Sequence, residues 1–226
     1  MAEAILDKLA RSVDMYMPLL ALCVYLWLWK KIKRQQLLLL IYLISNVLFG
    51  AVTDVMGFFH INNLALYHFD TLYEQWLVSF YLATKIIDGK IPLLYYFINI
   101  GYTIFWIINI IGWEPLNIFN SNSAVVSNLI LLLICMYYML DLSKKDEILY
   151  FQKLPSFWIV SAFLIYSALT ILIFAVYKYY IIQNLIDEGN KIWNLMYITI
   201  PIKFIMISVG LLCYKKTISI PKPLLL

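Results

Sequence analysis

The sequence predicts an all-α membrane protein with seven transmembrane helices, and three observations support that class. Of the 226 residues, 64% are hydrophobic and 13% are charged, whereas soluble domains are roughly 45–50% apolar and about 25% charged. The apolar residues fall into seven runs, near the roughly 20 residues that a helix needs to cross a bilayer. The runs are continuous rather than alternating, which favours helices over the strands of a barrel.

The runs predict where each span begins and ends. We place the spans near 13–29, 37–59, 64–87, 91–113, 124–141, 155–178 and 192–214, within a single domain that covers residues 1–226. The connections are short, so no separate catalytic module is expected. No small-residue cleavage site follows the first run, so this run is expected to be a retained span and not a removed signal peptide.

Basic residues between the spans predict the orientation. The first, third and fifth connections and the C-terminal tail together carry twelve lysines and arginines, and the N-terminus and sixth connection carry four. Because basic connections stay in the cytoplasm, the N-terminus is predicted outside and the C-terminus inside, in a cell (inner) membrane. The net charge of +4 then reflects membrane topology, and no nucleic-acid partner is expected. The remaining basic residue, Lys203, lies in the middle of the last span.

The third span carries the densest set of polar side chains. Asp70 and Glu74 are about 40° apart around a helix, so they share a face. In the predicted orientation spans three and seven both run inward, which places Glu74 and Lys203 at one depth, roughly 15 Å below the outer edge. A lone charge there costs at least ~2.5–3.5 kcal/mol. We therefore predict an intramembrane pair of Glu74 and Lys203, used either for stability alone or for ligand or proton binding.

More polar side chains gather toward the outer ends of the spans and predict a pocket that opens outward. Its predicted members, besides the charge pair, are Asp54, His60, Asn63, His68, Asp70, Asn120 and Tyr166. A second interpretation stays open for the amides. They can cap helices, as Asn120 would before the fifth span, or they can form hydrogen bonds between spans.

Specific chemistries find little support in the residues. A lysine in the last of seven spans suggests a retinal Schiff base, but rhodopsins carry an aspartate one turn earlier, where this chain has Thr199. His60 and His68 are the only histidines, too few for a zinc centre unless Asp54 and Asp70 complete it. The cysteines match no metal motif, no nucleophile motif is present, and neither a metal nor a cofactor is predicted.

Several short strings resemble those of a family of bacterial seven-span membrane proteins that has no assigned reaction. The strings are Asn62-Asn63-Leu-Ala-Leu-Tyr-His68, Leu72-Tyr-Glu74, Phe119-Asn120-Ser121-Asn122, Phe157-Trp158, Leu164-Ile-Tyr166 and Ile202-Lys203. They extend over about residues 60–212. The resemblance implies seven helices, and the association of such families with two-component signalling genes implies a sensory role.

These observations favour a membrane receptor or sensor-like protein that binds a small or lipidic ligand. The cytoplasmic connections are too short for a catalytic output, so signalling requires a cytoplasmic or membrane partner in addition to the surrounding lipid bilayer. The alternative function is a channel or transporter for protons or small solutes, as a single copy or as a homo-oligomer. A membrane-embedded enzyme is the third interpretation, although the residues favour a protein that is not an enzyme.

Overall fold

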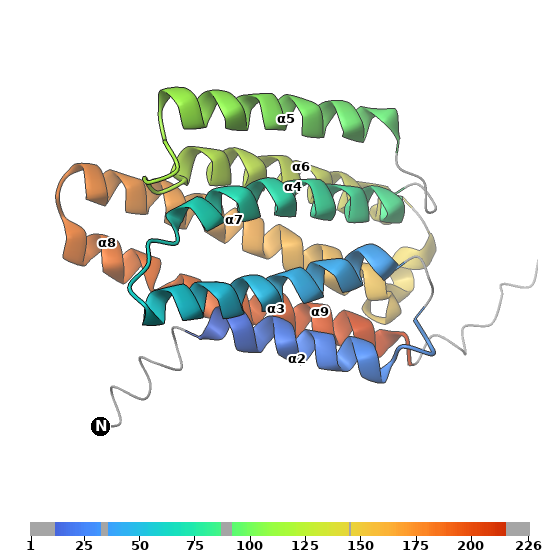
Figure 1. The fold of residues 1–226 in the computed structure, drawn as a ribbon. Helices are drawn as coiled ribbons and strands as arrows, with labels where there is room; N and C mark the ends of the chain where they lie inside the picture. The colour runs from blue at the N-terminus through green and yellow to red at the C-terminus, as the bar shows by residue number, and fades with distance from the viewer. Residues whose placement is uncertain (1–11, 33–35, 87–91, 145, 216–226) are drawn as a thin grey trace, which may run out of the picture.

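The computed structural model describes residues 12–32, 36–86, 92–144 and 146–215, and these residues form helices with no strand among them (Figure 1). In chain order the helices are α2 (Val13–Trp27), α3 (Leu37–Phe58), α4 (Leu64–Ile86), α5 (Leu93–Gly112), α6 (Ser121–Ser143), the 3-10 helix η2 (Asp146–Lys153), α7 (Pro155–Ile182), α8 (Ile186–Trp193) and α9 (Met196–Cys213). The all-helical prediction is confirmed, and each predicted span coincides with a helix to within a few residues.

Some sequence-based expectations fall on residues outside the described ranges. They are the predicted span ends at residues 87 and 91 and the basic residues Lys8, Arg11, Lys33, Arg34, Lys90, Lys145, Lys216 and Lys222.

Five helical segments are long and apolar enough to cross a membrane, which indicates a multi-pass membrane protein. They are α3, α5, α6, α7 and the segment Ile186–Cys213 that contains α8 and α9. The helix α2 is apolar but has only 15 residues, and α4 carries two acids. Large apolar side chains cover the outside of the bundle: Leu48, Leu133 and Leu172 are 60%, 57% and 62% exposed. Such a surface suits hydrocarbon and not water.

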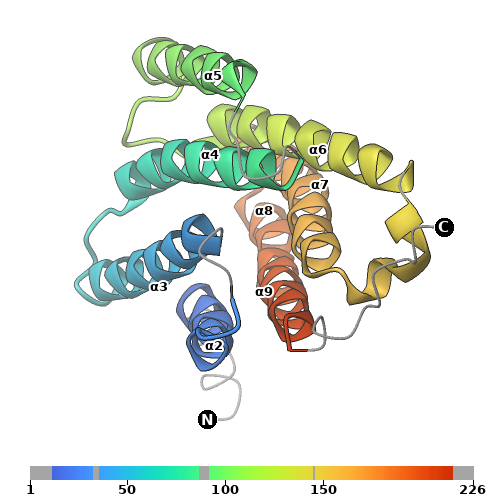
Figure 2. The ribbon, with the colours of Figure 1, turned by 90° about the vertical axis from the view of Figure 1, so that its right-hand side faces the viewer.

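Six helices form a closed ring, and α5 lies outside it (Figure 2). Around the ring, α2 packs on α3, α3 on α4, α4 on α6, α6 on α7, α7 on α9, and α9 on α2. From the outside α5 packs on α4 and α6, and α8 packs on α7. The order of helices in space therefore departs from the order in the chain at α5.

Two glycines allow close crossings within the ring. A Cβ added at Gly50 of α3 would lie 2.7 Å from the carbonyl oxygen of Asp14 on α2, and a Cβ at Gly210 of α9 would lie 2.7 Å from Cγ1 of Ile159 on α7. Small residues at such crossings let membrane helices approach closely. The first crossing sets the position of Asp14.

Hydrogen bonds attach α5 to the ring. Nδ2 of Asn99 donates to Oγ of Ser79 at 2.7 Å, and Nε1 of Trp106 donates to the carbonyl oxygen of His68 at 3.0 Å. Hydrogen bonds of this kind link helices in lipid, where apolar side chains gain little from contact with one another.

The two halves of the ring differ in composition. In the half where α3 and α7 begin, apolar side chains fill the interior: Leu43, Leu82, Phe163 and Ile207 are each at most 1% exposed. This apolar plug, contributed by α3, α4, α7 and α9, closes one end of the ring.

Candidate functional site

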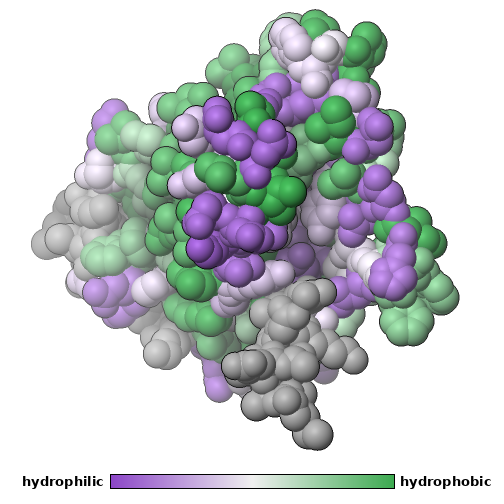
Figure 3. Space-filling view, turned by 90° about the vertical axis from the view of Figure 1, so that its left-hand side faces the viewer, coloured by the Kyte–Doolittle hydropathy of each residue, from purple (hydrophilic) through white to green (hydrophobic). Residues whose placement is uncertain are grey.

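The other half of the ring encloses a cavity of about 260 Å³. It lies at the end where α2, α4, α6 and α9 begin, and all six ring helices line it. Hydrophilic side chains gather on this end of the molecule (Figure 3). The charged residues that line the cavity are Asp14, Asp54, Asp70, Glu74 and Lys203, and the aromatic ones are Phe49, Tyr67, Tyr166, Phe174, Trp193, Tyr197 and Phe204.

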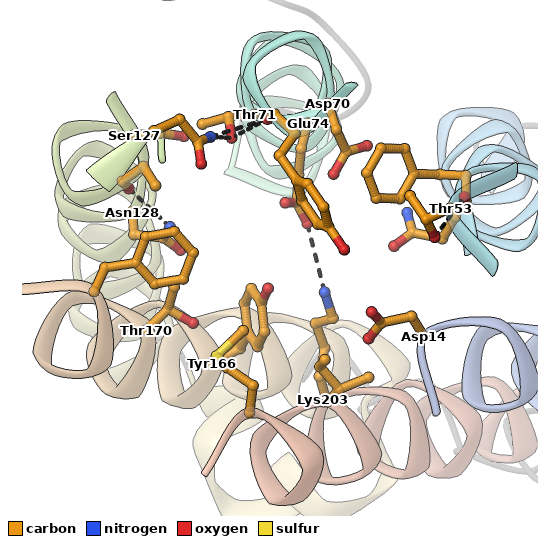
Figure 4. A pocket seen from close by; sticks show the side chains of 18 of the residues that line it. Asp14, Thr53, Asp70, Thr71, Glu74, Ser127, Asn128, Tyr166, Thr170 and Lys203 are labelled. Atoms are coloured by element: carbon orange, nitrogen blue, oxygen red, sulfur yellow. Dashed lines mark hydrogen bonds and ion pairs between the residues drawn. The ribbon is translucent and has the colours of Figure 1, made fainter. Parts of the chain in front are cut away.

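A charge pair of Glu74 and Lys203 lies in the cavity (Figure 4). Nζ of Lys203 is 3.5 Å from Oε1 of Glu74, and the two side chains are 3% and 19% exposed. The hydroxyl of Tyr42 donates a hydrogen bond of 2.9 Å to the same oxygen. The structure therefore brings together the carboxylate and the ammonium that depth alone predicted to pair, and their functional role stays a prediction.

Aromatic rings surround the ammonium of Lys203. Its Nζ lies 3.6 Å from the ring centroid of Tyr166 on α7, 4.8 Å from that of Phe204 and 5.7 Å from that of Tyr42. Contacts between a cation and an aromatic face are stronger away from water. These contacts and the Glu74 carboxylate together stabilise the Lys203 ammonium within the apolar sequence of α9.

Three further carboxylates line the cavity on α2, α3 and α4. The carboxylates of Asp14, Asp54 and Asp70 form no ion pair or hydrogen bond within the described part of the chain, although Lys203 acts on Asp14 and Asp70 electrostatically from a longer distance. Asp54 and Asp70 are sequence-predicted pocket residues, and the structure places both in the cavity, together with Asn63. Sequence reasoning missed Asp14, although its place in the first turn of a helix end predicted to lie outside was a usable signal.

Asn120 lines the cavity, but its side chain does not cap α6 as the second interpretation expected. Its Nδ2 donates to the carbonyl oxygen of Tyr67 at 2.9 Å and to Oγ1 of Thr71 at 2.6 Å. The amide thus links the start of α6 to α4 across the mouth of the ring.

A carboxylate from the preceding loop supplies the missing cap. Oε2 of Glu114 accepts a hydrogen bond of 2.8 Å from the backbone N–H of Asn122 in the first turn of α6. Oε1 of Glu114 lies 2.7 Å from Nζ of Lys178 on α7, and Asn109 at the end of α5 donates to Oε2 at 3.1 Å. An acid at a helix N-terminus is favourable because the first N–H groups lack partners. This cluster joins α5, α6 and α7, and sequence reasoning missed the pairing.

The structure corrects the expectation that both histidines line the pocket. His60 follows α3 in an exposed turn with φ of 56°. His68 is fully buried, and its Nε2 lies 2.9 Å from the carbonyl oxygen of Ile118. His68 is about 160° around the helix from Asp70, so it faces away from the cavity. Within the described residues, no group of three or more His, Cys, Asp or Glu is placed to hold a metal ion.

Gln75 lies on the same side of α4 as His68 and likewise faces away from the charged residues of the cavity. Oγ of Ser127 on α6 donates to Oε1 of the buried Gln75 at 2.9 Å. The polar side of α4 therefore divides into a cavity face, with Asp70 and Glu74, and a packing face, with His68 and Gln75.

Comparison of the chain with protein-family models, with curated proteins and with solved structures finds no match. The geometry of the cavity is thus the basis for a functional proposal.

Proposed function

We propose that this chain is a seven-helix, receptor-like membrane protein whose cavity binds a small ligand from outside the cell. The N-terminus lies outside and the C-terminus in the cytoplasm, as the distribution of basic residues predicts. The observation that carries the proposal is the cavity of about 260 Å³ inside the ring, close to the lower end of the roughly 300–1,000 Å³ typical of ligand pockets. In this orientation its mouth faces outward.

The burial of the acids supports α4 as a span. Asp70 and Glu74 line the cavity, so their charges face the ring interior and not lipid. Polar side chains in membrane helices are tolerated on that side and mark functional sites. The short α2 packs on α3 and α9, and without it the ring would be open to lipid. Both helices therefore belong to the membrane domain, which gives seven spans.

The apolar plug favours a binding protein over an open channel. Leu43, Leu82, Phe163 and Ile207 fill the ring on the cytoplasmic side of the charge pair. Water and ions cannot follow this path without a rearrangement of packed side chains. A transporter open to the outside shares this closed inner end, so transport of the same ligand is the second candidate function, supported by the buried Glu74–Lys203 pair.

A receptor of this design needs a partner for its output. The one described helix in the proposed cytoplasmic connections is η2, which has eight residues. That is too small for a catalytic domain. Ligand binding in the cavity would therefore be transmitted by a shift of the ring helices to a cytoplasmic or membrane protein.

Thermal unfolding of the purified protein in lipid nanodiscs tests the proposal. A panel of small cations, neutral polar compounds and anions is screened. A compound that binds is detected because a ligand at 100 times its Kd raises the free energy of unfolding by about 2.7 kcal/mol. A cavity ligand raises the unfolding temperature of the wild type but not of Ala124→Phe, because Ala124 lines the cavity. Ala65→Phe is the control, since Ala65 lies on α4 outside the cavity lining.

Uptake into proteoliposomes separates the two candidate functions. Accumulation of the stabilising compound, or a proton flux abolished by Glu74→Gln, identifies a transporter. If no compound stabilises the wild type more than Ala124→Phe, the cavity is not a ligand site.

A further inference from the structure

The charges that line the cavity are strongly unbalanced. Asp14, Asp54, Asp70 and Glu74 face a single ammonium, that of Lys203, and Glu74 already pairs with it. We infer that the ligand of the cavity is a small organic cation that carries an ammonium at one end and a second polar group at the other. The inference rests on the proposed function, because it names the chemical class of the ligand that the cavity binds.

The three remaining carboxylates surround one region of the cavity. Asp14 projects into the cavity from α2 and Asp70 from α4 (Figure 4), and Asp54 lines it from α3. Ionised carboxylates in a low-dielectric interior require a compensating positive charge. Within the described residues Lys203 is the one cation that lines the cavity. A ligand ammonium, with three N–H donors, supplies the missing charge and the missing hydrogen bonds together.

The arrangement favours an organic cation over a metal ion. A metal ion needs several ligands at one point, and no such group exists within the described residues. Aromatic rings also line the region: Phe49 and Tyr67 belong to the cavity wall and meet edge to face with centroids 5.2 Å apart. Aromatic walls attract organic ammonium groups and also cover the hydrocarbon part of such a ligand.

A separate observation on α7 indicates the second polar group. Thr170 lines the cavity and is 1% exposed, and its hydroxyl interacts with the side chain of Tyr166 one turn earlier but makes no hydrogen bond of normal geometry with the described residues. A buried hydroxyl whose hydrogen bonding is incomplete costs free energy that a ligand can recover. Because Thr170 belongs to α7 while the three carboxylates belong to α2, α3 and α4, the ligand must have polar groups at both ends.

Three probes of equal length, which differ in one terminal group, test the charge. They are 5-amino-1-pentanol, 1,5-pentanediol and 5-hydroxypentanoate, added to the full-length protein in nanodiscs. Thermal unfolding and isothermal titration measure binding. We expect the amino alcohol to bind and stabilise the protein, and the neutral diol and the anion to bind at least about tenfold more weakly, as the loss of a charge-assisted interaction implies.

Matched variants test the residues. Asp70→Asn is expected to weaken binding of the amino alcohol at least about tenfold, whereas Asp187→Asn, at an exposed position of α8, leaves it unchanged. Thr170→Val is expected to weaken the amino alcohol but not 1-aminopentane, which lacks the hydroxyl. Should Asp70→Asn fail to give a monodisperse protein, Asp54→Asn replaces it.

Each contrary result has a distinct meaning. Equal or tighter binding of the diol or the anion overturns the cationic ligand but leaves the proposed ligand site intact. Stabilisation by Ca²⁺ in place of the amines overturns the organic class. The cationic ligand is also rejected, and the site kept, if all three probes fail to bind but a compound of another class stabilises the wild type and not Ala124→Phe. If the wild type responds to no compound at all, the proposed function fails with it.

Discussion

The hydroxyl of Tyr42 on α3 donates a 2.9 Å hydrogen bond to Oε1 of Glu74 on α4. The same oxygen lies 3.5 Å from Nζ of Lys203 on α9, so one carboxylate joins three helices of the ring. This junction separates the polar cavity from the apolar plug. Its donors supply both a charge and a hydrogen bond, which is how a buried carboxylate is stabilised in an interior of low dielectric.

Removal of the ammonium alone should destabilise the protein more than removal of both charges. Lys203→Met leaves Glu74 with only the Tyr42 hydroxyl, and loss of one partner of a buried pair costs about 3–5 kcal/mol. The double variant Glu74→Gln/Lys203→Met should recover part of this loss. Unfolding temperature measured by tryptophan fluorescence checks the order. Lys191→Met, at an exposed pair on α8, is the control that should not move, and a double variant less stable than Lys203→Met contradicts the pairing.

The hydroxyl of Tyr42 should matter apart from its ring. Tyr42→Phe keeps the ring, whose centroid is 5.3 Å from that of Phe163, but removes a hydrogen bond to a charged acceptor, which is worth about 1.5–3 kcal/mol. Tyr81→Phe is the matched control, because the buried hydroxyl of Tyr81 has no hydrogen-bond partner within the described residues. Its removal should be neutral or stabilising. Equal losses for both variants in the same unfolding measurement would show that packing, and not the bond to Glu74, sets the effect.

Two glycines of α3 should respond oppositely to alanine. Gly50→Ala places a Cβ 2.7 Å from the carbonyl oxygen of Asp14, so α2 must move and the protein should lose about 1–3 kcal/mol. At Gly57 an added Cβ meets nothing within 4 Å, so Gly57→Ala should gain up to about 1 kcal/mol from helix propensity. Thermal unfolding checks the signs. A neutral Gly50→Ala would mean that α2 and α3 do not cross this closely.

The cluster around Glu114 should contribute more than a surface ion pair. Glu114→Ala leaves the Asn122 N–H, the Asn109 amide and the Lys178 ammonium without this acceptor, and a buried unsatisfied group costs about 1–3 kcal/mol. Glu188→Ala removes an acid of α8 whose side chain is 50% exposed and should have little effect. Lower stability together with faster proteolysis between α5 and α6 is expected for Glu114→Ala only. If Glu188→Ala costs as much, the cluster has no special role.

Labelling with a membrane-impermeant maleimide checks the orientation. With the three native cysteines replaced by alanine, Ile61→Cys, in the exposed turn between α3 and α4, should react in intact cells. Ser143→Cys, exposed at the end of α6, should react only after the membrane is opened. The reverse pattern would place the cavity mouth in the cytoplasm and overturn binding from outside.

Sequence reasoning found the helices and the charge pair because both depend on simple regularities. Apolar runs of membrane length mark helices, and the direction of each span sets the depth of any residue on it. One carboxylate and one ammonium at a single depth then predict a contact across 129 positions of chain. The contact between Glu74 and Lys203 could therefore be predicted without knowing which helices are neighbours.

The remaining parts of the site depend on neighbours that a single sequence does not reveal. The apolar run of α5 looks like those of the ring helices, so nothing local places it outside. Yet Gln75 contacts Asn99 on α5 and Ser127 on α6, and Trp106 on α5 bonds to the carbonyl oxygen of His68. That side of α4 therefore packs against α5 and α6, while Asp70 and Glu74 line the cavity. Similarly, Asn120 precedes α6 as a capping residue would, but its amide bonds to α4 because the ring places Thr71 beside it.

The wide separation of Glu74 and Lys203 along the chain has a consequence for synthesis. The chain must elongate by 129 residues after Glu74 before Lys203 exists, which at about 5–20 residues per second takes roughly 6 to 26 s. In the proposed seven-span topology, α4 enters the membrane during that interval with an acid whose cation has not yet been translated. Since α9 also closes the ring against α2, its translation supplies both the neutralising charge and the helix that encloses the cavity.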